Sequence, residues 1–248
     1  RRSLGGSSEL RAAATAAVPG SSDVMPGSQL QLAAKRIVDV AVASTSIVAL
    51  SPLMAGIAVA IRLDSAGPAL FVQERVGRGG KVFRLCKFRT MTAGAPIQFN
   101  ADGTTRVEAS DARITRLGRY LRGALDELPQ LINVVAGDMS LVGPRPDMPI
   151  HLSLYDERDH KKLAVRPGMT SLAAVLGRNG LPVKTRFAID VDYVERWSFL
   201  LDLKIIAQTL LLPLDIYAFD FGDVTTRARL GEVRPTHVQA EPPLGREP

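Results

Sequence analysis

Two adjacent acids, Asp126 and Glu127, are the side chains of this sequence best suited to covalent chemistry on a phosphate. They come directly before Leu128 and Pro129. Because proline is tolerated in a helix only in the first turn, we expect a helix to begin near Leu128 and to run through Val135. The acids would then lie at its positive end, where exposed N–H groups keep carboxylates ionised. Such a pair can hold a divalent cation and offer a carboxylate nucleophile, whereas capping of the helix is the commoner use of an Asp at this place.

A proline-flanked arginine follows the acids in the sequence. Arg145 lies in the segment Gly143-Pro144-Arg145-Pro146, where the two prolines stiffen the backbone on either side of it. A planar guanidinium held in this way suits a phosphate, which it can contact with two donors at once. The same four residues could equally form a structural turn with the arginine facing solvent.

The positive charge of the chain is concentrated in residues 71–122. This stretch holds eleven Lys and Arg against four Asp and Glu, a net of +7, whereas the whole chain of 248 residues has a net charge of +6. Its first part predicts two short strands, Ala69 to Gln73 and Lys81 to Lys87, joined by a glycine-rich turn at Gly77 to Gly80. The glycine spacing matches neither a dinucleotide fingerprint nor a P-loop, so the pattern argues against a Rossmann-type fold.

Three arginines precede the two acids at intervals of three residues. Arg116, Arg119 and Arg122 would lie on one side of a short helix. Such a stripe is most often a solvated face, and it is of interest here because Asp126 and Glu127 follow it. Beside the two acids, the arginines could neutralise the charge of a diphosphate substrate.

The elements that must position these side chains begin with an apolar run from Ile37 to Ile61. Its 25 residues contain a single charge, Asp39, and are long enough to cross a bilayer as a straight helix. Ser51-Pro52 lies in its middle, where proline kinks a helix. Basic residues flank both ends, so each end is predicted to face the cytoplasm (Lys35, Arg36, Arg62, Arg75 and Arg78). A re-entrant helix that bends at Ser51-Pro52 satisfies both features, but a straight span or a buried hairpin of a soluble core also fits this run.

Composition divides the chain into four parts. Residues 1–34 and 222–248 are predicted tails, residues 35–62 the apolar helix, and residues 63–221 a compact α/β unit, helix-rich around a small sheet. Within it, the mostly apolar stretch from Trp197 to Phe219 could lie at a membrane interface or be an ordinary buried helix. One cysteine and three scattered histidines exclude a disulfide framework and a Cys/His zinc site.

From Lys35 to about Leu214 the chain resembles the bacterial sugar transferases, the monotopic polyprenyl-phosphate phosphoglycosyl transferases. The resemblance rests on segments that occur in the family's order: KRIVDV followed by Ser51-Pro52, KFRTM at Lys87 to Met91, RITRLGRYLR, LDELPQLINVVAGDMSLVGPRP, VRPGMTS and DVDYVERWSFLLDLKI. Each segment alone is a weak signal, whereas the ordered set is very specific.

This resemblance implies an enzyme of the bacterial inner membrane. Such enzymes transfer a sugar 1-phosphate from a nucleoside diphosphate sugar, usually a UDP-sugar, to a polyprenyl phosphate such as undecaprenyl phosphate, and release the nucleoside monophosphate. They act at the cytoplasmic face and begin the assembly of exopolysaccharide, capsule, O-antigen or glycoprotein glycans. The implied partners are a UDP-sugar, polyprenyl phosphate and the lipid bilayer, with no nucleic acid and with the oligomeric state left open.

The resemblance also implies roles for individual residues. The family's Asp-Glu dyad matches Asp126 and Glu127, with Asp126 as the nucleophile that forms a phosphosugar intermediate and Mg²⁺ bound beside the pair. A further functional acid of the family matches Asp190, and its re-entrant helix matches Ile37 to Ile61, with the break at Ser51 and Pro52. The residues that match or adjoin its basic phosphate ligands are Lys87, Arg89, Arg122 and Arg145.

The chain departs from the family pattern at two places. The link between Arg122 and Asp126 is one residue shorter than usual, and two polar positions after VRPGMTS are Ala174 and Leu176, which bears on sugar or nucleotide selectivity.

Two rival functions are an inactive membrane-anchored scaffold or partner protein of the same fold, and a nucleic-acid-binding protein, suggested by the basic charge. The intact dyad argues against the first, and the nearly uncharged apolar run argues against the second. Assays for UMP release from UDP-sugars and for salt-dependent binding to DNA or RNA distinguish the three.

Overall fold

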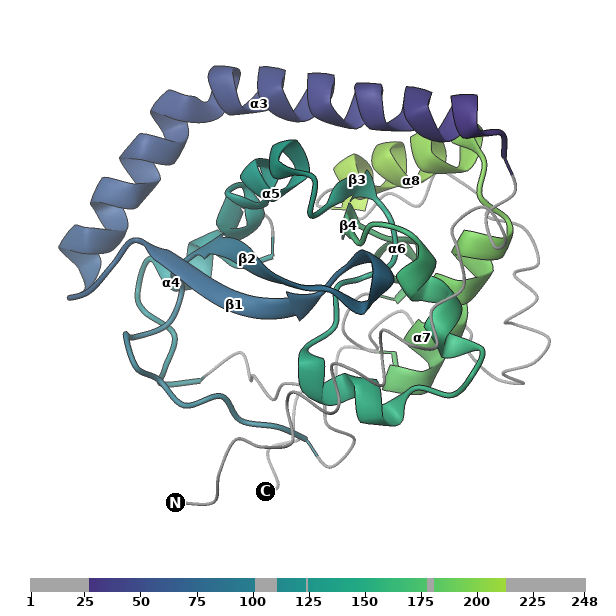
Figure 1. Ribbon diagram of the computed structural model, residues 1–248. Helices are drawn as coiled ribbons and strands as arrows, with labels where there is room; N and C mark the ends of the chain where they lie inside the picture. The colour runs from purple at the N-terminus through teal and green to yellow at the C-terminus, as the bar shows by residue number, and fades with distance from the viewer. Residues whose placement is uncertain (1–26, 101–110, 124, 178–180, 213–248) are drawn as a thin grey trace, which may run out of the picture.

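The computed structural model describes residues 27–100, 111–123, 125–177 and 181–212. Most of the predicted tail 1–34, and all of 222–248, lie outside the described residues. Figure 1 shows a long helix across the top of the molecule, a two-stranded hairpin at the centre and shorter helices beneath and beside it. The helices are α3 (Gln29–Asp64), α4 (Gly118–Leu121), α5 (Gln130–Ala136), α6 (Leu172–Gly177), α7 (Val183–Glu195) and α8 (Phe199–Leu211). The strands are β1 (Leu70–Val76), β2 (Val82–Phe88), β3 (Ser140–Val142) and β4 (Gly168–Thr170).

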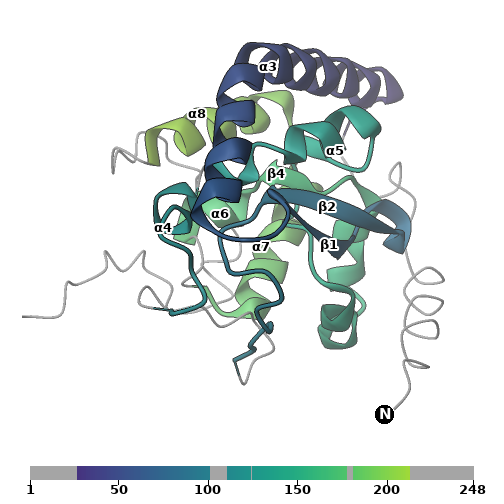
Figure 2. The ribbon, with the colours of Figure 1, turned by 90° about the vertical axis from the view of Figure 1, so that its left-hand side faces the viewer.

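Helix α3 contains the whole apolar run and begins before it. Ser28 and Gln31 form a capping box, which starts the helix at Gln29 inside the predicted tail. The helix does not break at Ser51-Pro52, as the family resemblance implied, but continues through it as one 36-residue element. It bends, as the central proline predicted (Figures 1 and 2). Pro52 cannot donate to the Val48 carbonyl, and the Ser51 hydroxyl donates to that oxygen at 2.8 Å, so the bend leaves no orphaned acceptor there.

Polar contacts fasten the N-terminal half of α3 to the rest of the protein. Lys35 Nζ donates to Asp202 Oδ2 of α8 at 2.6 Å. Asp39, the single charge of the apolar run, is buried and accepts from the Ser140 hydroxyl of β3 at 2.7 Å. A buried carboxylate needs such partners, so Asp39 fixes the helix in one register on β3.

The C-terminal half of α3 is fastened to the same body. Ile57 and Ile61 pack into a buried cluster with Phe88 of β2 and Leu121 of α4. Asp64 Oδ2 accepts from the Leu117 backbone N–H at 3.1 Å. The helix therefore rests with both ends on one globular unit.

The hairpin confirms the two predicted strands. β1 and β2 are antiparallel, with Leu70 opposite Phe88 and Val76 opposite Val82, and the turn between them contains Gly79 and Gly80 at positive φ. A second, smaller sheet pairs β3 with β4 in parallel. Described residues thus form a mixed α/β structure with two two-stranded sheets, which is not Rossmann-like.

Two glycines bring the arginine loop against the segment before β4. A Cβ on Gly168 would lie 2.1 Å from the Gly143 backbone nitrogen, and one on Gly143 would lie 2.5 Å from the Arg166 carbonyl oxygen. Both positions require glycine because the two backbones touch. The turn Val165 to Gly168 thus serves as the support of the loop that carries Arg145.

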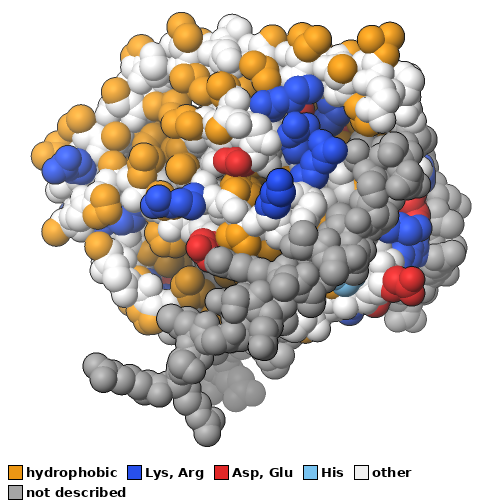
Figure 3. Space-filling view, viewed as in Figure 1, with side chains coloured by type: hydrophobic (Ala, Val, Ile, Leu, Met, Phe, Trp, Pro, Cys, Tyr) orange, Lys and Arg blue, Asp and Glu red, His pale blue; other side chains and the backbone are white. Residues whose placement is uncertain are grey.

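Apolar side chains remain exposed along α3. Figure 3 shows them gathered over this helix, with Lys and Arg side chains below them. They include Ile37, Val42, Val48, Leu53, Val59 and Leu63. In the described part of the chain, α3 is the one helix long and apolar enough to cross a membrane. The predicted interfacial or buried stretch from Trp197 to Phe219 is described only to residue 212, and this part forms α8, which buries Ile205 and exposes Leu200, Leu203 and Leu210.

Candidate active site

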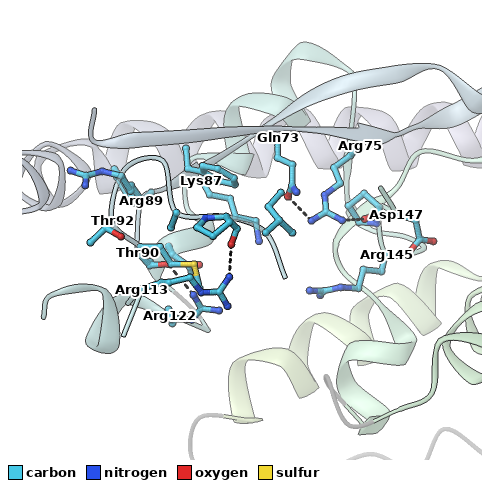
Figure 4. A pocket seen from close by; sticks show the side chains of 18 of the residues that line it. Gln73, Arg75, Lys87, Arg89, Thr90, Thr92, Arg113, Arg122, Arg145 and Asp147 are labelled. Carbon is cyan, nitrogen blue, oxygen red and sulfur yellow. Dashed lines mark hydrogen bonds between the residues drawn. The ribbon is translucent and has the colours of Figure 1, made fainter. Parts of the chain in front are cut away.

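A cavity of about 960 Å³ lies below the hairpin and contains most of the predicted site residues. Its wall is formed by β1, β2, the segment after β2, the arginine loop and the start of α7. In Figure 4, Lys87 lies between two groups of side chains. One group contains Arg89, Thr90, Arg113 and Arg122, and the other contains Gln73, Arg75, Arg145 and Asp147.

The two acids lie in a short 3-10 turn just before α5. The turn spans Leu125–Glu127, and α5 begins at Gln130, two residues after the predicted start. Asp126 does not cap α5, whose N-cap is Pro129 without a side-chain hydrogen bond. Its Oδ1 instead accepts from the Gly123 N–H at 3.0 Å, which holds the carboxylate at the cavity wall.

Burial and nearby charges separate the pKa values of the two acids. Burial raises the pKa of Asp126 above its usual range, and the adjacent Glu127 adds to this, while Lys87 and Arg122 oppose it. Burial would also raise the pKa of Glu127, but the positive charges of Lys87 and Arg145 outweigh it, so the pKa is lowered. Glu127 Oε1 accepts from Lys87 Nζ at 3.0 Å. Glu127 is therefore firmly anionic and ion-paired, whereas Asp126 is the more basic carboxylate.

The predicted arginine stripe does not form. Helix α4 ends at Leu121, and Arg122 follows it in an extended conformation. Arg122 lines the cavity and donates to the Thr90 hydroxyl at 3.3 Å. Arg116 and Arg119 do not line it. Because Gly123 has φ +91°, the chain turns sharply here and returns Asp126 to the same wall as Arg122.

Arg89 lines the cavity, but its guanidinium faces the end of α3. It is buried and donates to the Pro68 carbonyl at 2.6 Å and to the hydroxyl and carbonyl of Ser65, each at 2.8 Å. These are backbone and hydroxyl acceptors of the segment between α3 and β1. In this structure Arg89 therefore connects the end of α3 to the site and has few donors left for a phosphate.

Arg145 is held at the cavity wall by a buried network under its loop. Its backbone N–H donates to Asp190 Oδ2 at 3.2 Å. Lys162 Nζ lies between that oxygen, at 2.8 Å, and Asp147 Oδ2, at 2.6 Å. Tyr155 donates its hydroxyl to the same Asp147 oxygen at 2.7 Å. The network fixes the loop from below and leaves the Arg145 side chain on the cavity side.

Asp190, predicted as a further functional acid, is fully buried on α7 and does not line the cavity. Burial raises its pKa, and Lys162 opposes this. For Lys162 burial would lower the pKa, but Asp147 and Asp190 outweigh it and raise it. We interpret Asp190 as a support of the arginine loop. Ala174 and Leu176, where the chain departs from the family pattern, also lie off the described cavity wall.

Several residues that line the cavity were missed as site residues by sequence reasoning. Among them are Arg75, Asp147 and Arg186. The position of Asp147 directly after the arginine loop was a usable signal, and Arg75 belongs to the basic stretch. Arg186 carries no signal in its local sequence, because only the packing of α7 brings it to the cavity.

The dyad offers the ligands that Mg²⁺ prefers. Among the described residues there is no group of three or more His, Cys, Asp and Glu that could enclose a metal. Mg²⁺, however, is usually held by one or two carboxylates together with substrate phosphates and water. Asp126 Oδ2 and Glu127 Oε2 have no hydrogen bond to described residues, while the other oxygen of each carboxylate is engaged. The donor set fits Mg²⁺ with a phosphate substrate.

Comparison with known proteins gives consistent matches. Residues 30–215 match the family described as bacterial sugar transferase. A protein of Caulobacter vibrioides named UDP-glucose:undecaprenyl-phosphate glucose-1-phosphate transferase is 43% identical over 185 residues, which cover 71% of this chain and 68% of the relative. The exopolysaccharide production protein ExoY of Sinorhizobium fredii is 38% identical over 188 residues, covering 71% and 83% of the two chains. A Bacillus subtilis sugar transferase, EpsL, is 40% identical over 177 residues, covering 71% and 85%.

Proposed function

Because the chain belongs to the bacterial sugar transferase family, we propose that it transfers a sugar 1-phosphate from a UDP-sugar to undecaprenyl phosphate and releases UMP. The observation that carries the proposal is that Asp126 lines a basic cavity, while Glu127 lines a smaller adjoining hollow, and that Lys87 and Arg145 line both. This arrangement suits a diphosphate substrate and a carboxylate nucleophile.

The reaction proceeds in two displacements. An Asp126 oxygen attacks the β-phosphorus of the UDP-sugar, and the bond from that phosphorus to the bridging oxygen breaks as UMP leaves. A phosphate oxygen of undecaprenyl phosphate then attacks the phosphorus of the aspartyl phosphosugar, which releases the Asp126 carboxylate and forms undecaprenyl diphosphate sugar. The raised pKa of Asp126 indicates a carboxylate more basic than usual, and hence a better nucleophile once it is ionised.

The basic residues lower the repulsion between an anionic nucleophile and an anionic substrate. Lys87 and Arg122 act on the side of Asp126, and Arg145 acts on the side of Glu127. When bound at the two acids, Mg²⁺ supplies further neutralisation of the diphosphate. Where no water separates these charged side chains from the substrate phosphates, each electrostatic interaction is stronger than it is in solution.

We also propose that α3 is a re-entrant membrane helix at the cytoplasmic face of the bacterial inner membrane. Both of its ends contact the same globular unit, through Lys35 and Asp39 at one end and through Ile61 and Asp64 at the other. These contacts favour a placement with both ends on one side of a bilayer. The bend at Pro52 lets the exposed apolar side chains between the two ends enter the lipid.

An adduct experiment tests the catalytic proposal. Incubation with a UDP-sugar and Mg²⁺, without lipid acceptor, should release UMP and leave a phosphosugar mass on the peptide that contains Asp126. Asp126→Asn should abolish both, whereas Asp156→Asn, which removes a carboxylate exposed at the surface, should change neither. UMP release that requires undecaprenyl phosphate would indicate direct transfer. Absence of turnover with any UDP-sugar in the presence of acceptor would indicate an inactive scaffold.

A further inference from the structure

Arg75 and Arg186 form a second basic group in the cavity, apart from Arg122. Arg75 comes from β1 and Arg186 from the first turn of α7, and both line the cavity. Figure 4 shows Arg75 beside Arg145 on the far side of Lys87 from Arg122. The Nε atoms of Arg75 and Arg186 are buried, and neither has a hydrogen-bond partner among the described residues. Buried donors of this kind require an acceptor, and the cavity is the place from which one can come.

The charge at this end is not balanced by the protein. Burial, together with the nearby Arg145 and a smaller effect from Arg186, lowers the pKa of Arg75 to about 10, although Asp147 and Glu127 oppose this. The acids near Arg75 are already engaged: Asp147 pairs with Lys162 at 2.6 Å, and Glu127 pairs with Lys87. Three guanidinium groups in one enclosed place therefore favour the binding of an anion.

In-line displacement decides which anion belongs there. The nucleophile and the leaving group lie on opposite sides of the phosphorus that is transferred. Lys87 and Arg122 line the cavity together with Asp126, and the Gly123 N–H beside Arg122 donates to the Asp126 carboxylate, so the β-phosphoryl group is placed beside these two basic residues. The leaving group then points away from Asp126, toward the second group of arginines.

We propose that Arg75 and Arg186 form the subsite that holds the phosphate of the departing nucleoside monophosphate. The inference rests on the proposed function and adds that different basic residues hold different phosphate groups of the substrate. Lys87 and Arg122 hold the group that is transferred, whereas Arg75 and Arg186 hold the group that leaves. Negative charge grows on the leaving phosphate as its bond to the β-phosphorus breaks, so these arginines also stabilise the transition state of the first step.

Separate measurement of the two half-reactions tests the subsite. Arg186→Gln is the variant of choice because no described hydrogen bond of the fold depends on that guanidinium, whereas Arg75 also donates to Pro146 and Gln73. We expect Arg186→Gln to weaken UMP binding, measured by calorimetry and by product inhibition, roughly 10- to 100-fold, the equivalent of one charged hydrogen bond. The KM for the UDP-sugar should rise, and the rate at which isolated phosphosugar adduct is discharged to undecaprenyl phosphate should not change.

The matched control is Lys184→Gln. Lys184 is two residues away in α7, but its side chain is 53% exposed, does not line the cavity and pairs with Asp159, so neither half-reaction should change. Unchanged UMP binding in Arg186→Gln would refute the subsite. If the wild type is an active transferase in the same assay, the proposed function is not affected by that result. Slower discharge with normal UMP binding would assign the arginines to the acceptor phosphate and also overturn the proposal. Failure of the wild type to release UMP at all would overturn the proposed function together with the subsite.

Discussion

Replacing Lys162 with Met should destabilise the protein and loosen the loop that carries Arg145. Lys162 has a side-chain exposure of 2%, and its ammonium lies 2.6 Å from Asp147 Oδ2 and 2.8 Å from Asp190 Oδ2. Methionine keeps the length and apolar stem of the side chain but removes the charge. Both carboxylates would then remain buried without their common cation.

The size of the effect follows from the burial of the three groups. Removing one partner of a buried ion pair costs about 3–5 kcal/mol, against a total stability of about 5–15 kcal/mol for a typical domain. For a chain of this length that corresponds to a fall in Tm of roughly 6–20 °C. The pKa of Lys162 is raised, so its contribution is complete below the ordinary lysine pKa of about 10.4 and is lost as the pH rises through the raised value. A comparison of the stability of Lys162→Met and the wild type near pH 7 therefore includes the full contribution of the Lys162 charge.

Thermal unfolding in lipid nanodiscs, with UDP-sugar kinetics on the same samples, provides the assay. Lys161→Met is the matched control, because the neighbouring Lys161 pairs with Glu195 at the surface, where an ion pair contributes only about 0–1 kcal/mol. Adding Asp190→Asn to Lys162→Met should recover part of the loss, since a neutral amide oxygen can still accept from the Arg145 N–H. The reasoning fails if Lys162→Met unfolds at the wild-type temperature, or if the two substitutions are simply additive.

Three further predictions concern the cavity and the helix. Arg145→Lys should lower kcat/KM roughly 10- to 100-fold without a change in Tm, because an ammonium cannot make the two-pronged contact of a guanidinium; equal turnover would remove Arg145 from the phosphate site. Since the pKa of Asp126 is raised, single-turnover UMP release should decline with falling pH at values above the ordinary Asp pKa of about 3.9, and Lys87→Gln should move that decline to higher pH. In a background without the native cysteine, Gln29→Cys and Ala66→Cys should both react with reagents only from the cytoplasmic side, and periplasmic labelling of either would contradict a re-entrant α3.

Local sequence signals predicted the parts of the fold that depend on local chemistry. The glycine-rich turn and the alternating strands gave the β1–β2 hairpin, and the proline after the acids gave the start of α5 to within two residues. Ser51-Pro52 predicted a disturbance of the long helix. It did not predict that the Ser51 hydroxyl would satisfy the Val48 carbonyl, so that the helix bends without breaking. Nor did it predict the capping box that starts α3 at Gln29.

The roles of individual basic residues could not be predicted, because they depend on partners far away in the sequence. Lys87 and Arg89 are two residues apart, yet one reaches Glu127 while the other is bound to the segment after α3. Arg122 enters the cavity only because α4 stops after Leu121, at a place where Gly118 packs so closely that a Cβ would lie 2.1 Å from the Thr90 carbonyl oxygen. Periodicity predicts a longer helix and cannot detect a contact of this kind.

The contacts of Arg89 explain how membrane attachment and catalysis share one structure. The segment that follows α3 leads directly into β1, and Arg89 binds its backbone at Ser65 and Pro68. The next residue, Thr90, accepts from Arg122 at the cavity wall. If α3 lies in the bilayer as proposed, these short, buried contacts would link its depth to the height of the cavity above the lipid. A lipid acceptor whose phosphate lies at the level of the headgroups can then meet Asp126 at a distance that the fold itself determines.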